Sequence, residues 1–246
     1  MAERLSEVWS ERTVGEVVAE DYRRAAIFKA FGIDFCCGGG RSVRSACEQA
    51  GAEYEAVARA LAGTTASEDD VGVADPASWE LERVVRHIIE EHHGYVRASV
   101  PVLREFTMKL ARVHGDRHGE LHEIRELVGD LTAELERHMK EEEEVLFPRI
   151  MALKSQARGS GGASVRAATI PLEDDHARAG DLLRRIRSLS EDYTPPEDAC
   201  TTYRATYAKL AEFEEDLHRH VHLENNVLFP RAAAAEAALA ATGPNE

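Results

Sequence analysis

The chain has 246 residues, and its 45 acidic against 30 basic side chains give a formal charge of −15. This acidic balance argues against nucleic acid and anionic membrane surfaces as partners. The length suits one large and one small domain, and 43% apolar residues are enough for a sizeable core. Because no apolar run approaches about 18 residues, we expect no membrane span, no signal peptide and a cytoplasmic protein.

The first part of the chain predicts a small helical domain over residues 1–63. Thr13 and Glu16 have the spacing of a capping box, and the apolar residues that follow predict one helix that stops around Gly32. The next segment, Asp34-Phe35-Cys36-Cys37-Gly38-Gly39-Gly40, carries glycines that let the backbone come close to whatever the cysteines contact. Two short helices are expected after it.

Residues 64–78 are small, polar or acidic, which predicts a linker between two domains. Four long segments of helical periodicity follow over residues 79–236, and residues 237–246 are expected to form a tail. No segment shows the alternation that is typical of a β-strand. The sequence therefore predicts an all-α protein whose larger domain is an up-down four-helix bundle.

Four signals mark the ends of the predicted bundle helices. Asp75-Pro76 predicts a helix cap followed by a first-turn proline, and His114 to Gly119 predicts a polar break after the first helix. Gly159 to Ser164 is typical of a flexible loop. Thr194-Pro195-Pro196-Glu197 has the pattern of a capping box, so we expect the fourth helix to begin there.

The bundle contains an internal repeat, in which a histidine, a glutamate four residues later and the sequence Val-Leu-Phe-Pro-Arg recur with the same spacing. The two copies span residues 138–149 and 220–231. A further histidine stands at nearly the same distance upstream of each copy. The residues that the repeat selects are His93, His138, Glu142, His176, His220 and Glu224.

Helical geometry predicts that these six side chains meet. Residues i and i+4 project to one side of a helix, and each selected residue is in phase with an apolar stripe that includes Val145 in the first copy and Val227 in the second. Burying two carboxylates without a counter-charge is costly, and cations remove that penalty. Six ligands suit two metal ions with bridging carboxylates better than one tetrahedral zinc. We therefore expect two iron ions, bridged by oxide or hydroxide, with manganese as the alternative.

Several neighbours of the selected residues have a second interpretation. His92 also fits the stripe of the first helix, but the spacing within the repeat favours His93. Glu134 and Asp175 are candidates for carboxylates that orient a ligand histidine. We expect a solvated charge run at Glu141, Glu143 and Glu144. We expect exposed side chains at His218 and His222. Polar residues rather than an accessory metal site are expected at His114, His118 and His122.

With these residues in view, the chain resembles the bacterial repair of iron centres proteins, a hemerythrin-like di-iron family that restores iron–sulfur clusters. The resemblance rests on Asp34 to Gly39, which matches the family's acidic, aromatic, Cys-Cys-Gly-Gly motif, and on Ala199 to Thr202 and Leu223 to Arg231. It implies a hemerythrin-like bundle with a small N-terminal domain, and it carries the family's ligands onto the same six residues. Two departures, Gly94 and Gly40, concern loop geometry and access rather than the metal site.

The four cysteines are too few and too unevenly spread for a disulfide framework. Adjacent cysteines can simply fill small spaces in a helical domain. The resemblance implies instead that Cys36 and Cys37 are thiols that pass on iron, sulfur or nitrosyl groups, or that are reversibly oxidised. Cys47 and Cys200 are expected to be inert.

The resemblance implies a protein that repairs iron–sulfur clusters damaged by nitric oxide or oxidative stress, by binding or reducing the damaging species, by donating iron, or by both. Its partners would be damaged iron–sulfur proteins, nitric oxide or an oxygen species, and an electron donor that the chain does not contain. A di-iron enzyme that reduces nitric oxide or peroxide is the first alternative. A protein that binds or senses oxygen or nitric oxide is the second, and the sequence leaves monomer and homodimer open.

Overall fold

The computed structural model describes residues 8–64, 76–155 and 164–241. Within these ranges the regular structure is helical, apart from one isolated bridge between Thr13 and Ser42. The chain divides into two compact units, one of residues 85–220 and one of residues 1–84 together with 221–246. Among the helices that the structure describes, none is long and apolar enough to cross a membrane.

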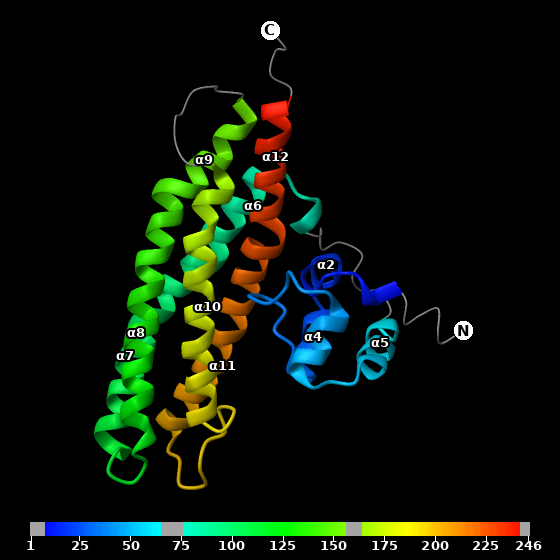
Figure 1. The fold of residues 1–246 in the computed structure, drawn as a ribbon. Helices are drawn as coiled ribbons and strands as arrows, with labels where there is room; N and C mark the ends of the chain where they lie inside the picture. Colours follow the sequence, from blue (N-terminus) through cyan, green and yellow to red (C-terminus); the bar gives the residue numbers. More distant parts are fainter. Residues whose placement is uncertain (1–7, 65–75, 156–163, 242–246) are drawn as a thin grey trace. The chain divides into compact units, whose positions relative to one another are not determined.

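The N-terminal part of the second of these units contains the short helices α2 (Val14–Glu20), α3 (Arg24–Ala30), α4 (Val43–Ala50) and α5 (Tyr54–Ala62) (Figure 1). The capping box of α2 is confirmed, because the Thr13 hydroxyl accepts from the Glu16 N–H and the Glu16 carboxylate accepts from the Thr13 N–H. The core of these helices includes Val14, Val17, Phe28, Val43 and Leu61, all buried.

The prediction of one helix up to Gly32 is wrong, because the chain breaks between α2 and α3. Asp21 is extended, with φ at −156°, and its carboxylate accepts a hydrogen bond from the backbone N–H of Arg23. An aspartate that binds the backbone two residues on offers that backbone an alternative to the helix ladder. The apolar periodicity therefore continues across two helices.

The bundle has four long helical segments. The first comprises α6 (Leu81–His87), η3 (Ile88–His93) and α7 (Gly94–His114), after the short η2 (Pro76–Ser78). The second comprises α8 (Glu120–Glu141), η4 (Glu142–Leu146), α9 (Phe147–Ala152) and η5 (Leu153–Ser155). The third is α10 (Val165–Leu189), and the fourth comprises α11 (Thr201–His222), η6 (Leu223–Leu228) and α12 (Phe229–Ala241). Figure 1 shows α7, α8, α10 and α11 side by side, which confirms the all-α, four-helix architecture.

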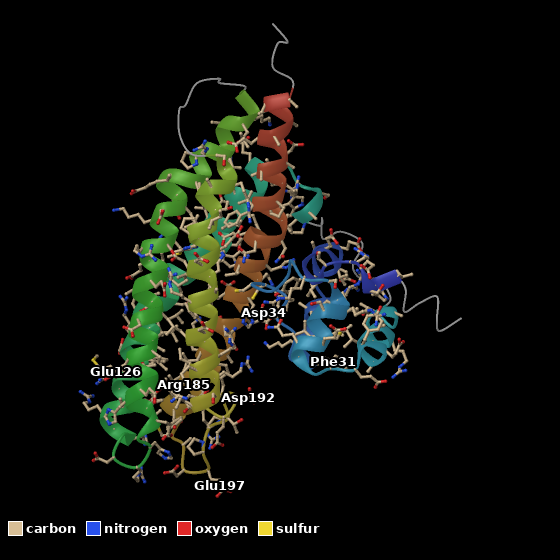
Figure 2. All side chains as sticks on the ribbon, in the orientation of Figure 1. Phe31, Asp34, Glu126, Arg185, Asp192 and Glu197 are labelled. Atoms are coloured by element: carbon tan, nitrogen blue, oxygen red, sulfur yellow. The ribbon has the colours of Figure 1, made fainter. Side chains whose placement is uncertain are left out.

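The start of the fourth helix is not where the capping-box pattern predicted it. The connection after α10 carries Asp192 and Glu197, both labelled in Figure 2, and α11 begins only at Thr201. Glu191, Asp192 and Tyr193 have positive φ angles of 50°, 56° and 59°, and the Thr194 N–H bonds back to the Ser190 carbonyl at 3.0 Å. Thr194 therefore closes the turn that ends α10 and does not cap the next helix.

Three of the four long segments contain a π-helical turn, namely η3, η4 and η6. A π turn takes up extra residues and so shifts the helix phase. Val145, which we expected on the inward stripe, is 60% exposed, whereas Leu146 and Phe147 are buried. The prediction for Val145 is wrong because η4 turns it outward.

Some predictions fall on residues that the structure does not describe. Most of the linker 64–78, including Asp75, lies outside the described residues, as do most of the loop from Gly159 to Ser164 and the last five positions of the chain. Pro76 belongs to the short η2, and α12 continues to Ala241.

Candidate metal centre

Five of the six predicted ligand residues form one buried cluster inside the unit of residues 85–220. The metal-binding atoms of His93, Glu142 and His220 lie within 4.8 Å of one another, and so do those of His138, Glu142 and His176. Glu142 is common to both groups. Because it is the first residue of η4, the π turn begins at the residue that joins the two histidine pairs.

The four imidazoles face one another in pairs. Nε2 of His93 lies 3.1 Å from Nε2 of His220, and Nε2 of His138 lies 2.9 Å from Nε2 of His176. The Oε2 atom of Glu142 is 3.4 Å from Nε2 of both His93 and His138. All five side chains are at most 2% exposed, so each nitrogen pair has a carboxylate close by and no access to bulk water.

Glu224, the sixth predicted residue, follows His220 by one turn in the continuous helix that runs from α11 into η6. Its side chain is fully buried. Glu142 stands in the same relation to His138, where α8 runs into η4. The repeat in the sequence is thus also a repeat in local structure.

A carboxylate that sequence analysis took for part of a solvated charge run orients His93. Oε1 of Glu143 lies 2.7 Å from Nδ1 of His93 and also accepts a hydrogen bond of 2.7 Å from Arg97. Burial raises the pKa of Glu143, but the hydrogen bonds to His93 and Arg97 outweigh it and hold the pKa below its usual value. A carboxylate on Nδ1 fixes the tautomer that leaves Nε2 free to bind a metal.

His138 has an equivalent partner on the neighbouring helix. Oδ2 of Asp175 lies 3.3 Å from Nδ1 of His138, and the same carboxylate accepts from Arg137 and pairs with Arg178. The second candidate carboxylate, Glu134, accepts a hydrogen bond of 2.8 Å from Arg178. Asp175 therefore contacts a cluster histidine directly, and Glu134 acts only through the arginine between them.

His92, the alternative to His93, is also buried, but its imidazole contacts Asp216 and not the cluster carboxylate. Its Nδ1 lies 3.0 Å from Oδ1 of Asp216, and its ring stacks on that of His220 with centroids 5.6 Å apart and planes 6° apart. Among the described residues, His93 belongs to one of the groups of metal-binding atoms, and His92 belongs to none. His92 supports the ring of His220 rather than joining the cluster.

The donor set fits a pair of metal ions. Imidazole nitrogen and carboxylate oxygen together are the ligands of iron and manganese sites in helical bundles, whereas iron–sulfur clusters need thiolates, which the two groups lack. Nitrogen lone pairs that face each other beside a buried carboxylate are stable only with protons or cations between them. The buried histidines and glutamate suit a non-haem di-iron centre.

A third group of possible metal-binding atoms lies in the N-terminal helical part and comprises Asp34, Cys36 and Cys37. Asp34, labelled in Figure 2, accepts hydrogen bonds from the backbone N–H groups of Cys36 and Cys37 at 3.1 and 3.0 Å. The two sulfur atoms lie 3.9 Å apart. The hydrogen bond to Cys37 and burial raise the pKa of the Cys36 thiol well above its usual value, while Cys37 is partly exposed.

The cysteine loop, residues 34–40, is held by the second copy of the repeat. Asn226 in η6 donates hydrogen bonds to the carbonyls of Cys36 and Phe35 at 3.1 and 3.4 Å, and Asn225 donates to the Cys36 carbonyl at 3.3 Å. Gly15 and Gly39 pack so closely on Asn226 that a Cβ atom at either position would clash with its side chain. From the sequence, this asparagine pair is visible only as part of a motif. The signal for its role is that the repeat has acidic residues at the matching positions.

His222, expected to be exposed, is 1% exposed, so that prediction is wrong. Its ring packs against those of Tyr22 and Phe35, with centroids 5.8 and 6.1 Å away. Burial lowers the pKa of His222 to about 4. A residue two positions along the helix from His220 is exposed only if nothing else covers that side. Here the side chains of Tyr22 and Phe35 cover it.

Comparisons with known proteins agree with this geometry. Residues 84–232 match the model of the hemerythrin HHE cation binding domain, and residues 10–64 match a domain of unknown function, DUF542. The chain is 35% identical over 228 residues to the iron-sulfur cluster repair protein YtfE of Dickeya chrysanthemi, which covers 93% of this chain and 99% of that protein. The proteins of the same name from Musicola paradisiaca and Escherichia coli O17:K52:H18 are 34% and 32% identical, each with 93% of this chain and 99% of the relative covered.

Proposed function

The chain belongs to the family of hemerythrin-like iron–sulfur cluster repair proteins, and from this premise we propose that it repairs iron–sulfur clusters damaged by nitric oxide or oxidative stress. The observation that carries the proposal is the combination of a buried histidine and glutamate cluster with a cysteine-bearing helical part. The cluster lies within residues 84–232 and the cysteines within residues 10–64, the two ranges that match domain models.

We infer that His93 and His220 hold one iron ion and that His138 and His176 hold the other, with Glu142 and Glu224 shared between them. The facing Nε2 pairs and the central position of Glu142 support this assignment, and the repeat supports Glu224. Two bound irons would supply electron transfer and binding of a small ligand. The sequence also predicted manganese as an alternative and an oxide or hydroxide bridge, and these stay predictions.

The surrounding residues serve that centre in distinct ways. Glu143 and Asp175 hold the Nδ1 side of His93 and His138, so that each Nε2 points inward. Phe147 stacks on His93 with centroids 5.7 Å apart and shields the ring from water. A set of imidazoles and carboxylates releases iron more readily than a thiolate cage, which suits donation of iron to a damaged cluster.

Cys36 and Cys37 form the second functional part of the proposal, as thiols that receive or pass on iron, sulfur or nitrosyl groups. The raised pKa keeps Cys36 in the thiol form, and Cys37 is the more exposed of the two. Cys37 should therefore react first. Limited alkylation of the full chain followed by mass spectrometry of the peptides tests this order, and modification of Cys36 before Cys37 would contradict it.

The direct test measures recovery of a dehydratase whose iron–sulfur cluster has been damaged by nitric oxide. Iron-loaded full chain should restore activity, Glu142→Ala should not, and Cys36→Ser/Cys37→Ser should restore it more slowly. Equal recovery with and without the chain would contradict the proposal. Many turnovers of nitric oxide or peroxide per chain with a reductant, without cluster recovery, would instead favour the di-iron enzyme.

A further inference from the structure

A thiol lies next to an imidazole at the C-terminal end of α7, and neither belongs to the buried histidine and glutamate cluster. Cys200 immediately precedes α11, and its side chain is exposed. Its Sγ atom lies 3.3 Å from Nε2 of His114, the last residue of α7. Nothing in the predicted iron centre or the cysteine loop involves this pair.

His114 is aimed at the thiol from inside the unit. The side chain is only 8% exposed, and its Nδ1 has no hydrogen-bond partner in the described part of the chain. The edge of Tyr203 packs against the ring, with centroids 5.5 Å apart. The Cys200 sulfur is therefore the polar group that this buried imidazole meets.

The segment before Cys200 is tied to the corner between α7 and α8, which fixes the pair. Oδ1 of Asp198 lies 3.2 Å from Nε2 of His118, and Asp198 also pairs with Arg117 at 3.4 Å. Tyr203 packs edge-on against His118 as well. Two residues before the thiol, the backbone is thus held by an ion pair and by an imidazole.

These contacts are those of a reactive thiol and not of a metal site. Among the described residues, no group of three metal-binding atoms includes Cys200 or His114. A thiolate at the first turn of a helix is stabilised by the N-terminal end of the dipole, and α11 has 22 residues. A histidine within hydrogen-bond distance can take up the thiol proton. Cys47 lacks such surroundings, because it is buried and burial raises its pKa.

We propose that Cys200 is a peroxide-reactive thiol and that His114 is its general base. The thiol proton moves to Nε2 of His114, the sulfur attacks one oxygen of a hydroperoxide, and the O–O bond breaks as an S–O bond forms. The leaving oxygen takes the proton from His114 and departs as water or alcohol. The sulfur is oxidised to a sulfenic acid and the hydroperoxide is reduced, so Cys200 is not the inert residue that the sequence led us to expect.

The test exposes the full chain to hydrogen peroxide, traps sulfenic acid with a dimedone probe, and measures labelling of the Cys200 peptide by mass spectrometry. General-base help is worth about 100-fold or more, so we expect labelling well above that of free glutathione and at least about a tenfold loss in His114→Gln. Glutamine can still hydrogen-bond to the thiol, which keeps the contact without the base. His122→Gln is the matched control, because His122 is an exposed histidine near the same corner and makes none of the contacts that fix the pair, and it should keep the rate.

Two results would overturn the proposal. One is a Cys200 labelling rate that is the same in His114→Gln as in the unmodified chain. The other is loss of labelling in Glu142→Ala, which would show that oxidation at Cys200 is driven by bound iron and not by His114. Helix content by circular dichroism confirms that each variant is folded.

Discussion

The two copies of the histidine and glutamate repeat fold alike and face different surroundings. Each places a buried histidine near the end of a regular helix, a buried glutamate one turn later, a π turn and then a Phe-Pro step. The valine after the glutamate shows the divergence. Val145 is 60% exposed in the first copy, and Val227 is 2% exposed in the second.

The two residues that follow each glutamate explain this difference. In the first copy Glu143 turns back to the imidazole of His93, and Glu144 is exposed. In the second copy Asn225 and Asn226 bind the carbonyl of Cys36. The same histidine and glutamate frame therefore recurs in both copies, while two adjacent positions decide whether the outer side of the turn faces water or holds the cysteine loop.

We expect the largest effect from replacing the histidine of each copy in turn, which tests whether the two copies contribute equally to metal binding. If the copies are equivalent at the metal, His138→Ala and His220→Ala should each reduce the iron content from about two ions per chain to one or fewer. Iron analysis of the purified variants measures this. His218→Ala is the control, since His218 is outside both ligand groups. Full iron retention in only one of the two variants would show that the copies are not equivalent.

The orienting carboxylate of the first copy gives the next largest effect. Glu143→Ala removes the partner of Nδ1 of His93, and loss of such a partner weakens metal binding by about 10- to 100-fold. Competition with a chelator measures the affinity. Glu144→Ala should change nothing, because Glu144 is exposed. An equal affinity for iron in the Glu143→Ala variant and the unmodified chain would show that Glu143 does not support the site.

The second copy should respond through its loop contact. Asn226→Ala removes one hydrogen bond to the carbonyl of Phe35 and one to that of Cys36, each worth about 0.5–1.5 kcal/mol. Urea unfolding measures the free energy, and the rate of Cys37 alkylation should rise as the loop loosens. Asn226→Asp, which keeps the size but loses the donor, should behave like the alanine variant. Stability and alkylation unchanged in both would show that Asn226 does not hold the loop.

The two valines give the smallest effects and the sharpest contrast. Val227→Ala opens a cavity in a buried site and should lower the free energy of unfolding by about 1–3 kcal/mol. Val145→Ala removes two exposed methyl groups and should change the free energy of unfolding by no more than about 0.5 kcal/mol. Thermal and urea unfolding of both variants check the difference. Equal costs would mean that the two copies have the same surroundings.

The repeat and its apolar stripe were enough to predict the four-helix fold and to select the six residues. The phase of Val145 could not be predicted, because an ideal helix has no π turn and only the missing N–H of Pro148 hints at one. The start of α11 was misplaced because a Thr-x-x-Glu pattern can also fall in a turn, as it does after three residues with positive φ.

The partners of the site depend on contacts between distant segments, which periodicity cannot show. Glu143 was taken for a surface charge because its neighbours in the sequence are acidic, yet it meets His93 on another helix. His222 was expected to be exposed because its own helix leaves it on another side from His220. Phe35 and Tyr22, from the N-terminal helical part, cover it.

The central claim is that one buried centre holds two irons between the copies of the repeat. Metal analysis and the visible spectrum of the full chain from iron-supplemented cells, beside Glu142→Ala/Glu224→Ala and the exposed pair Glu141→Ala/Glu144→Ala, test it most directly. The account predicts about two irons per chain with a ferric absorption band, lost in the first variant and kept in the second. One zinc ion, no metal, or iron that survives the loss of both buried glutamates would contradict it.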